Sequence, residues 1–168
     1  MGHARNNPPT QARVGNGIAA LLALTAAWSL LLAPAPAAHA SSVPTPEEHM
    51  RHLINAEREA RDLSKLTWGR RLTRVAVQQS HDMAEARTLF HNPRLPRVYD
   101  RLGCTILGEN VGVVDVTTDA IQAIDALHQG FMASPSHRKN VLRPVYDRVG
   151  IGALKSGGRI WISVLFMA

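Results

Sequence analysis

The chain has 168 residues, of which 19 are Lys or Arg and 13 are Asp or Glu, giving a formal net charge of +6. Its basic residues are scattered, with no run longer than Arg70-Arg71 or Arg138-Lys139, and aromatic residues make up only 5% of it, which argues against a nucleic-acid-binding protein. The single cysteine, Cys104, excludes an internal disulfide, and it is predicted to be a small buried apolar residue because no adjacent basic group would activate it.

The first forty residues have the successive features of a secretory signal peptide. A polar start with Arg5 and Arg13 but no acid leads into an apolar run over 18–33, and Ala38-His39-Ala40 supplies the small residues of a cleavage site. The alternative is a transmembrane anchor, but the run has 16 residues, whereas a bilayer span takes about 20. We predict that residues 1–40 are a signal peptide cleaved near Ala40, with no stable transmembrane span afterwards.

The remainder is long enough for one domain with a single core. We predict a short leader over 41–46 and one domain over 47–168, located in the cell envelope or the extracellular space. Removal of the two arginines of the signal lowers the formal net charge from +6 to +4, which still favours a mild attraction to an anionic envelope.

The first half of the domain is predicted to be helical. Thr45-Pro46-Glu47-Glu48 is a capping box, so a helix is expected to begin there and to end near Leu63. The connector over 64–69 carries Leu66 and Trp68, which we expect to be buried. Apolar residues three or four apart then predict a second helix over 70–89, with inner positions at Leu72, Val75, Ala76, Gln79, Met83, Ala86 and Phe90.

The second half mixes strands with one more helix. Two prolines predict a loop over 93–103, β-branched residues predict a strand over 110–116, and Asp119 begins a helix with an apolar stripe. A separate turn is expected over 134–142. Strands over 146–154 and 159–167 are joined at Ser156-Gly157-Gly158, and both faces of the second strand, including Trp161, are predicted to be covered. Three helices and an antiparallel sheet give an α+β layered domain.

Three polar segments lie where this scheme expects loops: Phe90–Pro93, Gly108–Asn110 and Ser134–Asn140. With other short motifs they occur in a fixed order: Leu53–Arg58, Leu66–Trp68, Ser80–Ala84, Phe90-His91, Gly108–Val111, Ser134–Leu142 and Val149–Gly152. In this order they resemble the short bacterial branch of the CAP superfamily, which unites cysteine-rich secretory proteins, venom antigens and plant pathogenesis-related proteins. The resemblance covers about residues 47 to 168 and implies a three-layer α-β-α sandwich with a central, mainly antiparallel sheet.

The resemblance also implies a cleft in which two histidines and two glutamates meet and in which some members bind zinc or another divalent cation. By motif, His91, Glu109 and His137 match three of the four positions. Ser134 stands one turn after Phe131, where the family has its second glutamate, so that glutamate is missing, and nothing indicates that His128 replaces it. His81 is predicted to face solvent.

The residues leave three functions open. Two imidazoles and one carboxylate suffice for a zinc ion with an open fourth position, and therefore for a metal-dependent hydrolase. The same residues also suit a polar cluster in a non-enzymatic binding module that engages an envelope component, a lipid or another protein. The third alternative is a purely structural envelope protein. The sequence favours the binding module, because no serine or cysteine nucleophile lies in a catalytic motif and the acidic set is incomplete.

Overall fold

The computed structural model describes residues 43–117 and 119–168. The predicted signal peptide over 1–40 and the first two leader residues lie outside this part of the chain. The described elements are α1 (Pro46–Glu59), β1 (Thr67–Trp68), α2 (Arg70–Ala86), α3 (Leu95–Leu102), β2 (Leu107–Asp115), α4 (Ala120–Ala133), α5 (Pro135–Val141), β3 (Arg148–Ser156) and β4 (Arg159–Met167). None of the described helices is long and apolar enough to cross a membrane.

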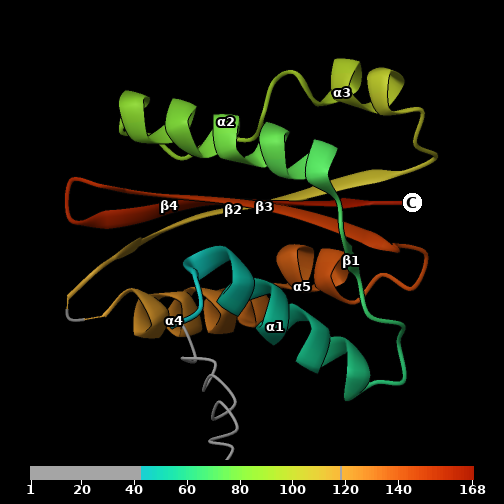
Figure 1. The fold of residues 1–168 in the computed structure, drawn as a ribbon, viewed down its shortest axis with the longest axis horizontal. Coiled ribbons are helices and arrows are strands. Elements are labelled where there is room, and N and C mark those ends of the chain that lie inside the picture. Colours follow the sequence, from blue (N-terminus) through green and yellow to red (C-terminus); the bar gives the residue numbers. More distant parts are fainter. Residues whose placement is uncertain (1–42, 118) are drawn as a thin grey trace, which may run out of the picture. The chain divides into compact units, whose positions relative to one another are not determined.

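The elements form three layers, as expected (Figure 1). A four-stranded sheet in the order β1-β3-β4-β2 lies between α2 and α3 on one side and α1, α4 and α5 on the other. The three long strands are antiparallel, and only the two-residue β1 pairs in parallel, with β3. The α+β class and the mainly antiparallel sheet are therefore confirmed. Because β2 ends the order, it is an edge strand.

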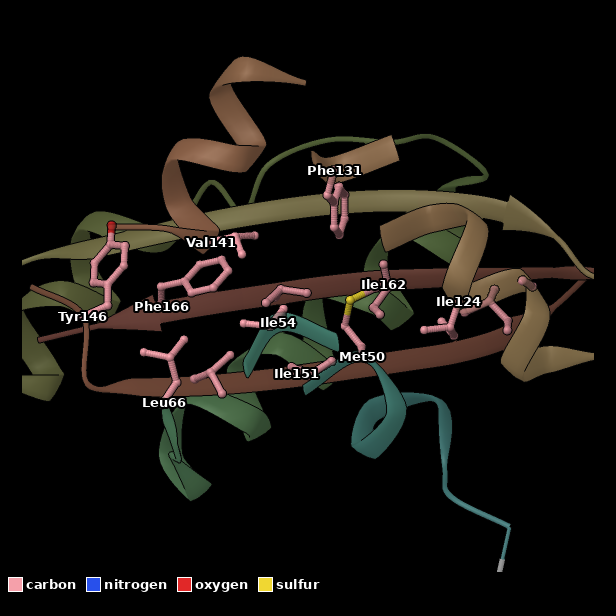
Figure 2. Close-up of a cluster of buried hydrophobic side chains, with 14 residues drawn as sticks. Met50, Ile54, Leu66, Ile124, Phe131, Val141, Tyr146, Ile151, Ile162 and Phe166 are labelled. Atoms are coloured by element: carbon pink, nitrogen blue, oxygen red, sulfur yellow. The ribbon is translucent and has the colours of Figure 1, made fainter. Parts of the chain in front are cut away.

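The side chains of β4 alternate between the two faces, and both faces are covered. Ile160, Ile162, Val164 and Phe166 enter the larger core under α1, α4 and α5. There Met50 and Ile54 of α1 meet the sheet, and Tyr146 stacks on Phe166 with ring centroids 5.6 Å apart (Figure 2). Trp161 and Leu165 point to the α2 side, where two smaller clusters lie. The predicted burial of Trp161 and Cys104 is confirmed.

Local signals determine most element ends. The capping box is present: Thr45 Oγ1 accepts from the Glu48 backbone N–H at 3.2 Å, and Glu48 accepts from the Thr45 N–H at 2.9 Å. The β3–β4 hairpin turns through Gly157 and Gly158, whose φ values of 60° and 76° are accessible to glycine at no steric cost. The first helix ends at Glu59, four residues before the predicted end.

Several predictions were wrong in detail. The segment over 93–103 contains the helix α3, because Pro96 lies in its first turn, where a proline needs no hydrogen-bond acceptor, and Gly103 ends it with φ 62°. The turn over 134–142 is likewise the helix α5, with Pro135 in its first turn. The domain therefore has five described helices, not the predicted three. Trp68 is 37% exposed rather than buried, because it lies on the edge strand β1. The guanidinium carbon of Arg51 lies 5.4 Å from the centroid of its ring.

The second helix lies directly on β3. It ends at Ala86 rather than Leu89, so Ala86 is exposed although the apolar stripe predicts it inside. Gly150 and Gly152 of β3 face it, and a Cβ on Gly152 would lie 2.2 Å from the Val77 backbone nitrogen. The Ser80 hydroxyl donates to the Gly152 carbonyl at 2.7 Å. The distance between helix and sheet is therefore determined by glycine.

The side chain of Arg58, on α1, forms hydrogen bonds to three backbone segments on the side of the sheet that α1, α4 and α5 cover. This side chain is fully buried and donates to four backbone carbonyls, those of Ser64, Val141, Arg143 and Tyr146, at 2.8 to 3.1 Å. Burial lowers the pKa of Arg58. A buried guanidinium is tolerated when its donors are paired, so Arg58 connects the end of α1 with α5 and the approach to β3.

Substitution of Gly152 tests the packing of α2 on β3. The Gly152→Ala change should lower the free energy of unfolding by about 3 kcal/mol, because the added methyl group forces α2 away from the sheet. Gly130→Ala is the matched control, since a Cβ at this α4 position meets nothing within 4 Å, and it should raise stability by about 0.5–1 kcal/mol through helix propensity. Urea unfolding measures both, and equal effects would contradict the packing argument.

His128 should make stability depend on pH. The side chain is 5% exposed, and its Nε2 has no hydrogen-bond partner among the described residues. Burial lowers the pKa of His128; Glu57 and Asp125 act in the opposite direction, and His49 lowers the pKa further.

Because the pKa of His128 is lowered in the folded protein, the unfolded chain protonates this imidazole more readily than the folded protein does. Stability should fall as the pH drops from about 6.5 toward the folded-state pKa, and level off below it. In His128→Leu this component is absent, so urea unfolding across that range should give a flatter profile for the variant. Parallel profiles for the two proteins would contradict the prediction.

Candidate functional site

The site is built on the edge strand β2. Glu109 lies within this strand, which begins at Leu107 rather than at the predicted residue 110, so Gly108–Asn110 is not a loop. Because successive side chains of a strand alternate, Glu109 points to the α2 side of the sheet and Asn110 to the α4–α5 side. The Glu109 side chain is only 1% exposed.

Three donors converge on the Glu109 carboxylate. Oε2 accepts from His91 Nδ1 at 2.8 Å and from the backbone N–H of Asn92 at 2.9 Å, while Oε1 accepts from the Ser163 hydroxyl of β4 at 3.1 Å. Since the carboxylate accepts, His91 carries a hydrogen on Nδ1. The carboxylate thus fixes the segment that follows α2 against the sheet.

The His91 ring is exposed to solvent even though its Nδ1 is hydrogen-bonded to Glu109. Its side chain is 62% exposed, and its Nε2 has no protein partner in the part of the chain that the structure describes. A buried carboxylate that holds one ring nitrogen fixes the tautomer and the direction of the ring, which leaves the other nitrogen as a positioned acceptor or ligand atom.

The other side of the strand is tied to α5 by two asparagines. Asn140 donates to the backbone carbonyl of Glu109 at 3.1 Å and to the side chain of Asn110 at 2.9 Å. Asn110 in turn donates to the carbonyl of His137 at 3.0 Å. The short helix that carries His137 is therefore held against the edge strand by the Asn140 side chain and by the His137 backbone carbonyl.

The His137 ring is partly buried and lies 5.1 Å from the ring of Phe131, centroid to centroid. Burial lowers the pKa of His137, and the charge of His91 lowers it further. His91 follows α2 and His137 lies on α5, so the two imidazoles come from opposite sides of the edge strand.

Of the three residues proposed from the motifs, the structure brings His91 and Glu109 into direct contact and joins His137 through Asn110. Ser134, in the position of the missing glutamate, lies 3.2 Å from Ser136, oxygen to oxygen. His81 is exposed on α2, as predicted.

Over residues 43–117 and 119–168, no group of three or more His, Cys, Asp or Glu side chains is arranged to hold a metal ion. The Glu109 carboxylate accepts three hydrogen bonds from protein donors, and its side chain is only 1% exposed.

Three further residues of the site, Asn92, Asn140 and Ser163, are not among those proposed from the motifs. Asn92 and Asn140 lie inside the polar segments singled out from the sequence, where a side-chain amide can bridge two backbones. Ser163 has a weaker signal: it is the one hydroxyl in the otherwise apolar run of β4 from Ile160 to Met167.

Comparison with known proteins identifies the family. The model of the cysteine-rich secretory protein family, or CAP, matches residues 51–166. The chain belongs to the CAP family. The expected resemblance is thereby confirmed, and the match includes His91, Glu109 and His137.

Relatives of this CAP protein occur in bacteria. The uncharacterized protein YkwD of Bacillus subtilis is 29% identical over 127 residues. The match covers 72% of this chain and 47% of the relative, so the chain spans about half of that protein. An extracellular SCP-domain protein from Bacillus anthracis is 23% identical with a TM-score of 0.60, over 73% of this chain and 40% of that one. An outer surface protein of Borrelia burgdorferi is 20% identical with a TM-score of 0.62, over 74% of this chain and 95% of that one.

The role of the buried carboxylate can be tested with Glu109→Gln. An amide replaces one acceptor oxygen with a donor that faces the donors of His91, Asn92 or Ser163. We therefore expect a loss of about 2 kcal/mol in the free energy of unfolding. Glu85→Gln, on the exposed face of α2, removes the same charge and should change stability by less than about 0.5 kcal/mol. Urea unfolding compares the two, and equal stabilities would show that the three hydrogen bonds contribute nothing.

Proposed function

We propose that this CAP protein is a secreted, non-enzymatic binding module that acts in the cell envelope or the extracellular space. In this proposal, residues 1–40 are the export signal, and His91, Glu109 and His137 form the cleft that contacts the ligand. The ligand is an envelope component, a lipid or another protein.

One observation carries the proposal: an exposed imidazole held in one orientation by a buried carboxylate. The Glu109 carboxylate accepts three hydrogen bonds and is shielded from solvent. A general base or a nucleophile must reach the substrate, and this carboxylate reaches only protein donors. His91, in contrast, offers an oriented Nε2 to solvent, which suits recognition by hydrogen bonding.

A ligand panel tests the proposal. The protein is assayed against vesicles, cell-wall glycans and envelope proteins by equilibrium binding. His91→Ala should weaken the bound class by about tenfold, since a hydrogen bond to a positioned group contributes roughly 1.4 kcal/mol. His81→Ala is the matched control, because that histidine is exposed on α2 and lies outside the cleft. Failure to bind any class, combined with turnover of a model substrate, would overturn the proposal.

The alternative is a metal-dependent hydrolase that uses the same cleft, with zinc or another divalent cation. The observation that favours a metal is the Glu109–His91 pair, because a carboxylate commonly orients a histidine ligand in this way. Here His91 and His137 would be the ligands, and Glu109 would support His91 from behind. The lowered pKa of His137 favours the neutral imidazole that a metal requires.

Zinc titration by calorimetry separates the two candidates. The metal alternative predicts binding that is lost in both His91→Ala and His137→Ala but retained in His81→Ala. The binding module predicts ligand binding that is unchanged by a chelator. Hydrolysis that depends on added zinc and on both histidines would replace the proposed function with the alternative.

A further inference from the structure

A basic groove lies between α2 and α3, on the side of the sheet that carries His91. Its volume is about 510 Å³, within the range of small-molecule sites. Five of the residues that line it are arginines, and none is an acid: Arg71, Arg74, Arg94, Arg97 and Arg101. We refer to it as the arginine groove.

Helical spacing explains how scattered arginines gather in one place. Arg71 and Arg74 are three residues apart and therefore share one face of α2. Arg97 and Arg101 are four apart and share one face of α3, and Arg94 immediately precedes that helix. Both helices lie on the same side of the sheet (Figure 1), so their basic faces line a common groove.

The protein leaves most of this charge uncompensated. Arg94 forms an ion pair with Asp82 of α2. The other four arginines form no salt bridge among residues 43–117 and 119–168, and each is exposed. Several like charges around one concave surface create a positive potential, which an anionic ligand relieves. Guanidinium groups suit phosphate in particular, because their planar donors bind its oxygens in pairs.

The groove also has an apolar floor. Val75 of α2 and both Val98 and Leu102 of α3 line it between the arginines, and all three are half-buried. A free phosphate ion would leave this surface unused. Aromatic residues, on which the bases of a single-stranded nucleic acid stack, do not occur in the lining. A cationic rim around an aliphatic floor is complementary to an amphiphile with an anionic head.

We propose that the arginine groove binds the phosphate headgroup of an anionic phospholipid, with the glycerol and the first part of an acyl chain lying over Val75, Val98 and Leu102. The groove would attach the protein to an anionic membrane surface. This inference goes beyond the proposed function, because it concerns a second site whose arginines contribute nothing to the Glu109 cleft.

Vesicle co-sedimentation with the purified protein tests the proposal. Vesicles that contain phosphatidylglycerol should bind the protein at low salt, and pure phosphatidylcholine vesicles should not. Each basic residue near an anionic surface contributes about fivefold in affinity. The double variant Arg97→Gln/Arg101→Gln should therefore weaken binding by about 25-fold, and so should Arg71→Gln/Arg74→Gln. The second variant keeps the test valid if the first disturbs α3.

The control variant removes the same net charge elsewhere. Lys155→Gln/Arg159→Gln changes the β3–β4 hairpin, which lies at the far end of the sheet from α3 (Figure 1). It should change vesicle binding by less than about threefold, an effect of general charge alone. If the control and the groove variants lose affinity equally, net charge explains the binding and the arginine groove is not a site.

Other results would also overturn the proposal. Equal binding to both kinds of vesicle would exclude recognition of an anionic headgroup. Full displacement from vesicles by millimolar inorganic phosphate would identify a free phosphate as the ligand, and tighter binding to an oligonucleotide would identify a nucleic acid. Because the groove variants leave His91 and Glu109 intact, failure here is distinguishable from failure of the ligand panel for the cleft.

Discussion

The buried carboxylate of Glu109 is the constraint around which the three layers are joined. A carboxylate shielded from water is tolerated only when donors replace that water, and here the donors come from the segment after α2 and from β4. The backbone carbonyl of the same residue accepts from Asn140 of α5, on the opposite face of the sheet. One residue of an edge strand thus connects both helical layers: its carboxylate binds His91, and its backbone carbonyl binds the helix that carries His137.

Close packing of helices on the sheet supports this arrangement. Gly150 and Gly152 lie against α2, while Gly108 and Gly112 of β2 lie against Tyr146 and α4; a Cβ on any of these glycines would approach a neighbouring atom within 2.2 to 2.7 Å. Interiors packed at this density transmit small displacements. Gly108 leaves room for Tyr146 and Asn140 on one face of the sheet, and the next residue, Glu109, binds His91, Asn92 and Ser163 on the other.

The hydrogen bonds of Glu109 and the arginine groove share one residue. Asn92 donates its backbone N–H to Glu109 and also lines the groove between α2 and α3. The two places nevertheless offer different chemistry. The Glu109 site presents one oriented imidazole, that of His91, whereas the groove presents a dense positive charge around an aliphatic floor. A module with both could attach to an anionic surface through one and contact a ligand through the other.

The family resemblance, the α+β class, the capping box of α1 and the β3–β4 hairpin could be predicted from the sequence, because these depend on local patterns and on motifs in a fixed order. The sequence did not reveal α3, since two prolines in a short exposed segment are typical of a loop as well as of a helix start, and the arginine groove was missed with that helix. Packing places Trp68 at an exposed edge of the sheet, brings the Ser163 hydroxyl to Glu109, and gathers arginines up to 30 positions apart in one groove. Side chains from separate elements become neighbours through packing, and no local pattern encodes that proximity.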